Sequence, residues 1–298
     1  MFAAHPLDHP LHYLWYHPLQ YLEIIRIYPG PSHSILIIRI FLFPPNRRNV
    51  LPELIFDSWA QYILTCSVLV VAQLVYVLFG FGSGLISVGI LALVFPDIRD
   101  VVVLLLLVNL PAEIWVTWKT RLEIRWRPIA ALGVGIAVGI PLGALVLRHG
   151  EPGFILTALG WFLVVVGIVF LRLPAAGKRS PQTWAAPPTG LVSGLLTGLF
   201  GTGGPPLIIW YHLSSPHKAA FRGNLMTIFL LMTFVRVPTY AATGMITIER
   251  IASMVVVMPA VLLGGWLGHR MHVEISEILF RRLVSGLLVV LGLGLLLG

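Results

Sequence analysis

Two copies of one glycine motif interrupt long apolar stretches of this chain. The first is Leu78-Phe79-Gly80-Phe81-Gly82-Ser83-Gly84, and the second, 121 residues later, is Leu199-Phe200-Gly201-Thr202-Gly203-Gly204-Pro205. A glycine cluster stops helix propagation and exposes backbone N–H groups, which hydrocarbon cannot satisfy. Such breaks persist at membrane depth only where protein or a polar cavity surrounds them. The matched pair therefore predicts a polar site between two halves of a membrane protein.

The composition indicates a polytopic membrane protein. Hydrophobic residues make up 57% of the 298 residues, charged residues only 11%, and the mean hydropathy is +0.91. The net charge of +8 does not indicate a nucleic-acid partner, because the basic residues lie in short clusters between apolar runs rather than along one amphipathic face. A single cysteine, Cys66, excludes an intrachain disulfide and any cysteine-based metal cluster.

The apolar segments divide into five followed by five more. Two of them, 84–96 and 204–214, are so short that at about 1.5 Å per residue they reach only about halfway through a ~30 Å hydrocarbon layer, as half-helices would. We predict an N-terminal, loosely ordered tail (1–57), a first transmembrane repeat (58–172), a polar linker (173–187) and a second repeat (188–298). The other apolar segments are 58–79, 101–118, 129–147, 153–172, 188–201, 222–243, 250–269 and 282–298.

Further landmarks support a duplication. Gly139-Ile140-Pro141-Leu142-Gly143 precedes Arg148 in the first half, much as Leu263-Gly264-Gly265-Trp266 precedes Arg270 in the second. Glycine-rich apolar helices are common, so the alternative is that both stretches are ordinary close-packing faces. The predicted fold class is an all-α polytopic membrane protein whose two homologous halves each hold a glycine-broken helix or hairpin plus three transmembrane helices.

The positions of the basic residues favour inverted halves. If each short segment forms a hairpin with its predecessor, three further crossings invert the second half, and one side then holds, after residue 58, only Arg99, Arg148 and Arg250. Parallel halves would leave no charge bias. Arg47 and Arg48 weigh against the inverted arrangement, which places the N-terminus outside. The basic residues on the predicted cytoplasmic side are Lys119, Arg121, Arg125, Arg127, Arg172, Lys178, Arg179, Lys218, Arg222, Arg270, Arg281 and Arg282.

The two breaks resemble anion sites. Proline is favoured at the first position of a helix, so a helix is expected to start at Pro205, with Gly203 and Gly204 before it. In the first break Gly82, Ser83 and Gly84 precede Leu85; Ser83 is a natural capping residue, and Thr202 is its counterpart. Free amides and the positive dipole end of each helix would attract an oxyanion. The alternative is that the glycines only allow close helix crossing.

Two ionisable residues lie well within apolar runs, where a charge is costly and tends to be functional. Arg236 could supply a fixed positive charge on an anion path, and Glu113 could pair with an arginine or carry a coupling proton. Either could instead lie near an interface, Glu113 especially because Trp115 and Trp118 follow it. Asn109 could line the path or join helices by hydrogen bonds.

Lys218 and Arg222 follow the second half-helix, one turn apart on one helix face. They could gather anions at the entrance of the site, or serve only as positive-inside residues.

Enzyme motifs are absent from the sequence. There is no Walker lysine motif, no His-Glu-x-x-His and no Gly-x-Ser-x-Gly, so we expect neither an enzyme nor a cofactor, and no metal. A rival interpretation is an intramembrane metal-dependent enzyme using His212 and His217. Another is a permease for a carboxylate or a cation on the same scaffold. The sequence does not indicate an oligomeric state.

The second motif resembles that of the sulfite exporter TauE/SafE family. The resemblance rests on residues 201–211, on Pro216, Lys218 and Phe221-Arg222, and on the first motif at 80–84, and it spans about residues 58–298. It implies a permease of a bacterial inner membrane for sulfur-containing anions such as sulfite or organosulfonates, with a duplicated fold of about eight helices. Many relatives carry a third glycine at the position of Pro205 and a Gly-Thr-Ser run at 222–225, which leaves the substrate open.

We therefore predict a secondary transporter for a small anion, embedded in the lipid bilayer. The anion is expected to bind between the breaks, through backbone amides at 82–84 and 203–205, the hydroxyls of Ser83 and Thr202, and the charge of Arg236.

Overall fold

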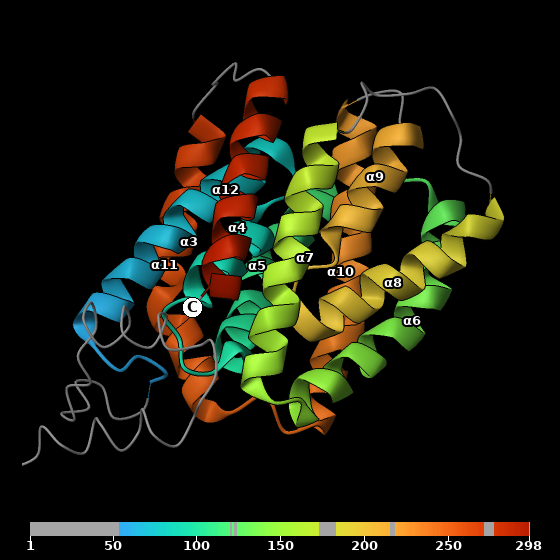
Figure 1. The fold of residues 1–298 in the computed structure, drawn as a ribbon. Coiled ribbons are helices and arrows are strands. Elements are labelled where there is room, and N and C mark those ends of the chain that lie inside the picture. Colours follow the sequence, from blue (N-terminus) through green and yellow to red (C-terminus); the bar gives the residue numbers. More distant parts are fainter. Residues whose placement is uncertain are drawn as a thin grey trace, which may run out of the picture.

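The computed structural model describes residues 54–119, 121, 124–172, 183–214, 218–270 and 277–297. Within these residues the chain forms ten α-helices and a short 3-10 turn, η2 (Thr183–Ala185), and no strand (Figure 1). The helices are α3 (Trp59–Phe79), α4 (Ser83–Leu91), α5 (Ile98–Lys119), α6 (Trp126–His149), α7 (Pro152–Arg172), α8 (Ala186–Phe200), α9 (Gly204–Ser214), α10 (Lys218–Ala242), α11 (Ile248–Arg270) and α12 (Glu277–Leu297).

Each predicted apolar segment corresponds to one helix. The two predicted half-helices are α4, with 9 residues, and α9, with 11 residues. α9 begins at Gly204, one residue before the predicted start, and Pro205 lies in its first turn. Proline is tolerated there because the first amides of a helix have no partner within it.

The described helices face lipid with apolar side chains. Six of them are long and apolar enough to cross a membrane. Large apolar side chains such as Val138 and Val290 are more than half exposed on the outer surface of the bundle. Exposing so much apolar surface to water would be unfavourable, whereas lipid can cover it. The chain is therefore an all-helical polytopic membrane protein, as predicted.

Glycine rows bring α6 and α8 into direct backbone contact. A Cβ atom on Gly139 would overlap the backbone oxygen of Leu191, and one on Gly198 would overlap that of Ile140. The two helices lie side by side in Figure 1 and run in the same direction. Such crossings are typical of membrane helices, where small residues allow close van der Waals contact. The facing glycines are Gly135, Gly139 and Gly143 in α6 and Gly190, Gly194 and Gly198 in α8.

A second pairing of the same kind joins α3 to α11. Gly264 lies against the backbone of Val70, and Gly268 lies against that of Leu74, so these helices also run parallel. In both pairings the first helix of one predicted half packs on the fourth helix of the other. The two halves are therefore interlocked, and neither forms a separate body.

The fifth helices of the two predicted halves, α7 and α12, run in opposite directions. Gly160 of α7 packs against Gly292 of α12, whereas Gly167, further along α7, packs against Ser285, which precedes Gly292. The fifth helices of the two halves are therefore antiparallel neighbours.

Charged residues gather at the end of the bundle where α5, α7 and α11 begin, which we call the lower end after its place in Figure 1. Arg250 forms an ion pair with Asp100 (2.7 Å). Arg99 donates hydrogen bonds to the carbonyls of Leu147 (2.9 Å) and Arg148 (3.0 Å). The three basic residues that the charge pattern assigns to one side thus lie together.

Most of the predicted tail and linker lies outside the described residues, which omit 1–53 and 173–182. The end of the predicted tail packs on the lower end, where the buried Phe56 ring meets Tyr62 and Phe95 at centroid distances of 5.4 and 6.1 Å. α8 begins at Ala186, slightly before the predicted start of the second half.

Replacing Gly139 by alanine is expected to destabilise the protein by at least about 2 kcal/mol, because the added methyl group would force α6 away from α8. The thermal unfolding midpoint of the detergent-purified protein measures this. Gly286→Ala in α12 is the matched control, because open space surrounds a Cβ atom there. Equal midpoints for the two variants would contradict the close crossing.

Candidate functional site

Both helix breaks begin with a glycine in the left-handed conformation. Gly80 ends α3 with φ 82° and donates its N–H to the Tyr76 carbonyl (2.9 Å). Gly201 ends α8 with φ 74° and donates to the Thr197 carbonyl at the same distance. L-residues rarely adopt this conformation, so the two matched glycines stop the helices at equivalent points. A third, Gly82, has φ 100° and precedes α4.

The predicted capping role of Ser83 is wrong. Gly82 is the capping residue of α4 and makes no side-chain capping bond, while Ser83 is the first helical residue. Thr202, the predicted counterpart, lies two residues before Gly204, where α9 begins. Glycine has no side chain that could cap the helix, so α4 begins at the left-handed backbone conformation of Gly82 without a side-chain cap.

The two short helices differ in the amides they offer. The first helical bond of α4 runs from Ile86 N–H to the Gly82 carbonyl (3.0 Å), so the amides of Ser83, Gly84 and Leu85 have no partner within the helix. In α9 the second and third residues are both proline. Pro205 therefore cannot be an amide donor, which corrects the prediction for 203–205.

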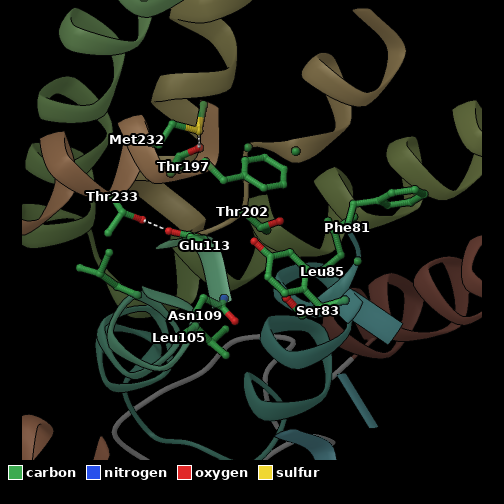
Figure 2. A pocket seen from close by; sticks show the side chains of 18 of the residues that line it. Phe81, Ser83, Leu85, Leu105, Asn109, Glu113, Thr197, Thr202, Met232 and Thr233 are labelled. Atoms are coloured by element: carbon green, nitrogen blue, oxygen red, sulfur yellow. Dashed lines mark hydrogen bonds between the residues drawn. The ribbon is translucent and has the colours of Figure 1, made fainter. Parts of the chain in front are cut away.

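The two glycine-rich breaks, one before α4 and one before α9, are in contact with each other. A Cβ atom on Gly84 would lie 3.3 Å from Cβ and Oγ1 of Thr202. Gly203 packs directly against α8, and its carbonyl accepts a hydrogen bond from the Ser193 hydroxyl. Between the breaks lies a pocket lined by α3, α4, α5, α8, α9 and α10 (Figure 2).

Nearly all predicted site residues line this pocket. Pro205 does not, and the side chains of Lys218 and Arg222 lie outside the described part of the chain. The predicted residues that line it are Gly82, Ser83, Gly84, Asn109, Glu113, Thr202, Gly203, Gly204 and Arg236.

Glu113 and Arg236 are buried, at 6% and 5% exposure, which excludes the interfacial alternative for both. The Thr233 hydroxyl donates to Glu113 Oε2 (2.7 Å), as Figure 2 shows. Arg236 Nη2 donates to the Val102 carbonyl (3.2 Å), and its guanidinium lies 5.1 Å from the Tyr240 ring centroid. In the part of the chain that the structure describes, no ion pair joins Glu113 to Arg236.

Several polar side chains at the pocket have no hydrogen-bond partner among the described residues. Arg236 Nε is buried without a hydrogen-bond partner among the described residues. The side chains of Ser83, Thr202 and Asn109 also line the pocket, and the described structure gives them no hydrogen-bond partner. Arg236 Nε is the pocket atom for which burial without a partner is costly, and together with the Ser83, Thr202 and Asn109 side chains it makes the pocket suited to a polar ligand.

A model of the family described as "Sulfite exporter TauE/SafE" matches residues 65–295. The chain belongs to the sulfite exporter TauE/SafE family. It is 28% identical over 224 residues to the "Probable sulfite/organosulfonate exporter TauE" of Cupriavidus necator, covering 73% of this chain and 87% of that protein. It is 26% identical over 196 residues to the "Probable inner membrane transporter protein TsaS" of Comamonas testosteroni, covering 64% of this chain and 81% of the relative. No solved structure matches the chain.

Membership in the TauE/SafE family agrees with the predicted transporter class and does not support the rival enzyme. Among the described residues no group of three or more potential metal ligands occurs, and the side chains of His212 and His217 lie outside them. The eight longer helices in the described part of the chain also agree with the expected number.

Three polar pocket residues of this TauE/SafE member were not predicted, namely Tyr76, Thr197 and Thr233. Tyr76 and Thr197 each lie four residues before the left-handed glycine that ends their helix, and Thr233 lies three residues before Arg236. Residues three or four apart share one helix face. Counting back from the break and from the buried arginine would have found all three.

Ser83→Ala should leave the free energy of unfolding within about 0.5 kcal/mol, because its hydroxyl makes no capping bond. Gly82→Ala should cost about 1–2 kcal/mol, because alanine is strained at φ 100°. Urea or thermal unfolding in one detergent would compare the two. If Ser83→Ala were the more destabilising, the hydroxyl would be the cap after all.

Proposed function

We propose that this protein is a permease of a bacterial inner membrane for a small oxyanion of the sulfite or organosulfonate type. The observation that carries the proposal is a group of polar side chains that line one pocket between two broken helices. Among them, Arg236 Nε has no hydrogen-bond partner in the described structure. The printed names of both relatives support it, since one is an exporter of sulfite and organosulfonates and the other an inner membrane transporter.

The anion would lie in front of α4. The amides of Ser83, Gly84 and Leu85 point out of the helix start, where the dipole adds positive potential. The hydroxyls of Ser83 and Thr202 would supply two further donors. Together these amides and hydroxyls would replace the hydration shell of an oxyanion, so that a ring of charged side chains around it is not needed.

Arg236 would provide the fixed charge that selects an anion. It is the only Lys or Arg lining the described pocket, and its Nε is free to donate. A cation would meet this guanidinium and two positive helix ends, so a cation permease is disfavoured. A carboxylate remains the second candidate, because it offers the same acceptor oxygens.

We also propose that the halves 58–172 and 188–298 are inverted repeats. The antiparallel contact of α7 with α12 and the reciprocal pairings of α3 with α11 and α6 with α8 support this arrangement. The lower end would face the periplasm, because it holds few basic residues. Alternating access would follow from movement of one interlocked set of helices against the other.

Liposomes with the purified protein should take up labelled sulfite or methanesulfonate, but not acetate at comparable rate and not divalent cations. Arg236→Gln should lower anion flux about tenfold or more, since a charge-assisted hydrogen bond contributes about 1.5–3 kcal/mol. Arg148→Gln is the control, because Arg148 is exposed at the lower end. Absence of anion flux in the wild type, or equal flux in both variants, would refute the proposed site.

Single cysteines placed at Arg148 and Arg282, in a Cys66→Ser background, should be labelled from opposite sides of the membrane. Both positions are exposed near the starts of the equivalent helices α7 and α12. A membrane-impermeant maleimide added to intact cells should modify position 148 only. Labelling of both, or of 282 alone, would contradict the proposed orientation.

A further inference from the structure

We propose that Glu113 carries a proton that binds and leaves together with the anion, so that the permease moves its substrate in step with a proton. This inference rests on the proposed function and names the second ligand of the same pocket.

The geometry places one carboxylate and one guanidinium in the pocket as separate groups. Glu113 is the only acidic residue among the described lining residues, and Arg236 the only basic one. They come from facing helices, α5 and α10, yet form no ion pair with each other in the described structure. The Thr233 hydroxyl donates a hydrogen bond to one carboxylate oxygen at 2.7 Å, and Tyr76 also lines the pocket beside this carboxyl group. A hydrogen bond therefore holds the Glu113 side chain in position, and no ion pair with a basic residue neutralises its charge.

Charge then couples the two ligands. With Glu113 ionised, a bound anion would share a low-dielectric pocket with a second negative charge, and one guanidinium would face both. A proton on Glu113 removes this repulsion, and a protonated carboxyl can still bond to Thr233. Each ligand therefore favours the other, and linkage requires the effect to be reciprocal. The anion and the proton enter and leave the site together.

No other described group at the pocket is suited to carry this proton. Arginine stays protonated and a tyrosine hydroxyl stays neutral near neutral pH, and α4, α8 and α9 contribute no ionisable lining residue. The remaining charged residues of α5 and of α11, which packs on it, lie in first or last turns, away from the pocket. They are Arg99, Asp100, Lys119, Glu249, Arg250, His269 and Arg270.

Liposome transport of methanesulfonate tests the proposal, because this probe stays ionised between mildly acidic and neutral pH. In the wild type, an imposed proton gradient should drive uptake above the external concentration, and exchange should rise toward acidic pH. In Glu113→Gln, gradient-driven accumulation should fall to about the external concentration, and any remaining exchange should no longer depend on pH. Glu113→Asp, which keeps the carboxyl group, is the matched control and should retain coupling.

Calorimetric binding in buffers of different ionisation enthalpy gives a second measure. Wild-type protein should take up a proton together with methanesulfonate at pH values where the empty site is still ionised, and Glu113→Gln should take up none. Coupling that survives in Glu113→Gln would overturn the inference. So would loss of both binding and exchange in Glu113→Gln alongside a fully active Glu113→Asp, since Glu113 would then be needed for the site itself.

Measurements on the wild type distinguish failure of this inference from failure of the proposed function. If the wild type exchanges anions but a proton gradient drives no accumulation, the permease proposal stands and only proton coupling is refuted. If the wild type exchanges no anion at all, the permease proposal itself is refuted.

Discussion

Direct backbone contact between helices fixes where this protein exposes its polar groups. Lipid gives membrane helices no hydrophobic reason to associate, so close van der Waals packing must hold them. The glycine rows of α6 and α8 supply that packing, and so do Gly264 and Gly268 of α11, which lie against α3. Two of the helices packed in this way, α3 and α8, are the ones that end at left-handed glycines. The crossings therefore set the depth and separation of both breaks, and hence the pocket between them.

The two breaks have the same backbone design but different chemistry. α4 begins with three amides that have no partner within the helix, whereas α9 begins with a glycine followed by two prolines. On the α9 side, Gly203 is packed against α8 and its carbonyl is bonded to Ser193, so little of that backbone is free. In the proposed site the second break would therefore contribute the Thr202 hydroxyl, and the first break would supply the amide donors.

Local features of the fold were predictable because they depend on local physics. Glycine clusters, proline and apolar run length predicted the ten described helices, the two short ones among them, with errors of a few residues at their ends. The cap of α4 was predicted wrongly because serine is the commoner capping residue, and the sequence does not reveal that Gly82 turns left-handed. The general location of the site followed from the breaks, since unpaired amides need a polar cavity.

Long-range features were not predictable from one sequence. The pairing of α3 with α11 and of α6 with α8 joins segments from different halves, and small-residue spacing does not identify a partner. The depth of Glu113 was ambiguous because Trp115 and Trp118, two and five residues later, are exposed as interfacial anchors would be. Only the packing of α3 and α10 around it, with Tyr76 and Thr233, makes it a pocket residue.

The charges of the pocket come from one helix of each predicted half, Glu113 from α5 and Arg236 from α10. Two groups of like charge in one pocket would repel each other. With opposite charges the pocket can be balanced without an internal ion pair. In the mechanism proposed above, an arriving anion would disturb that balance and one proton on Glu113 would restore it.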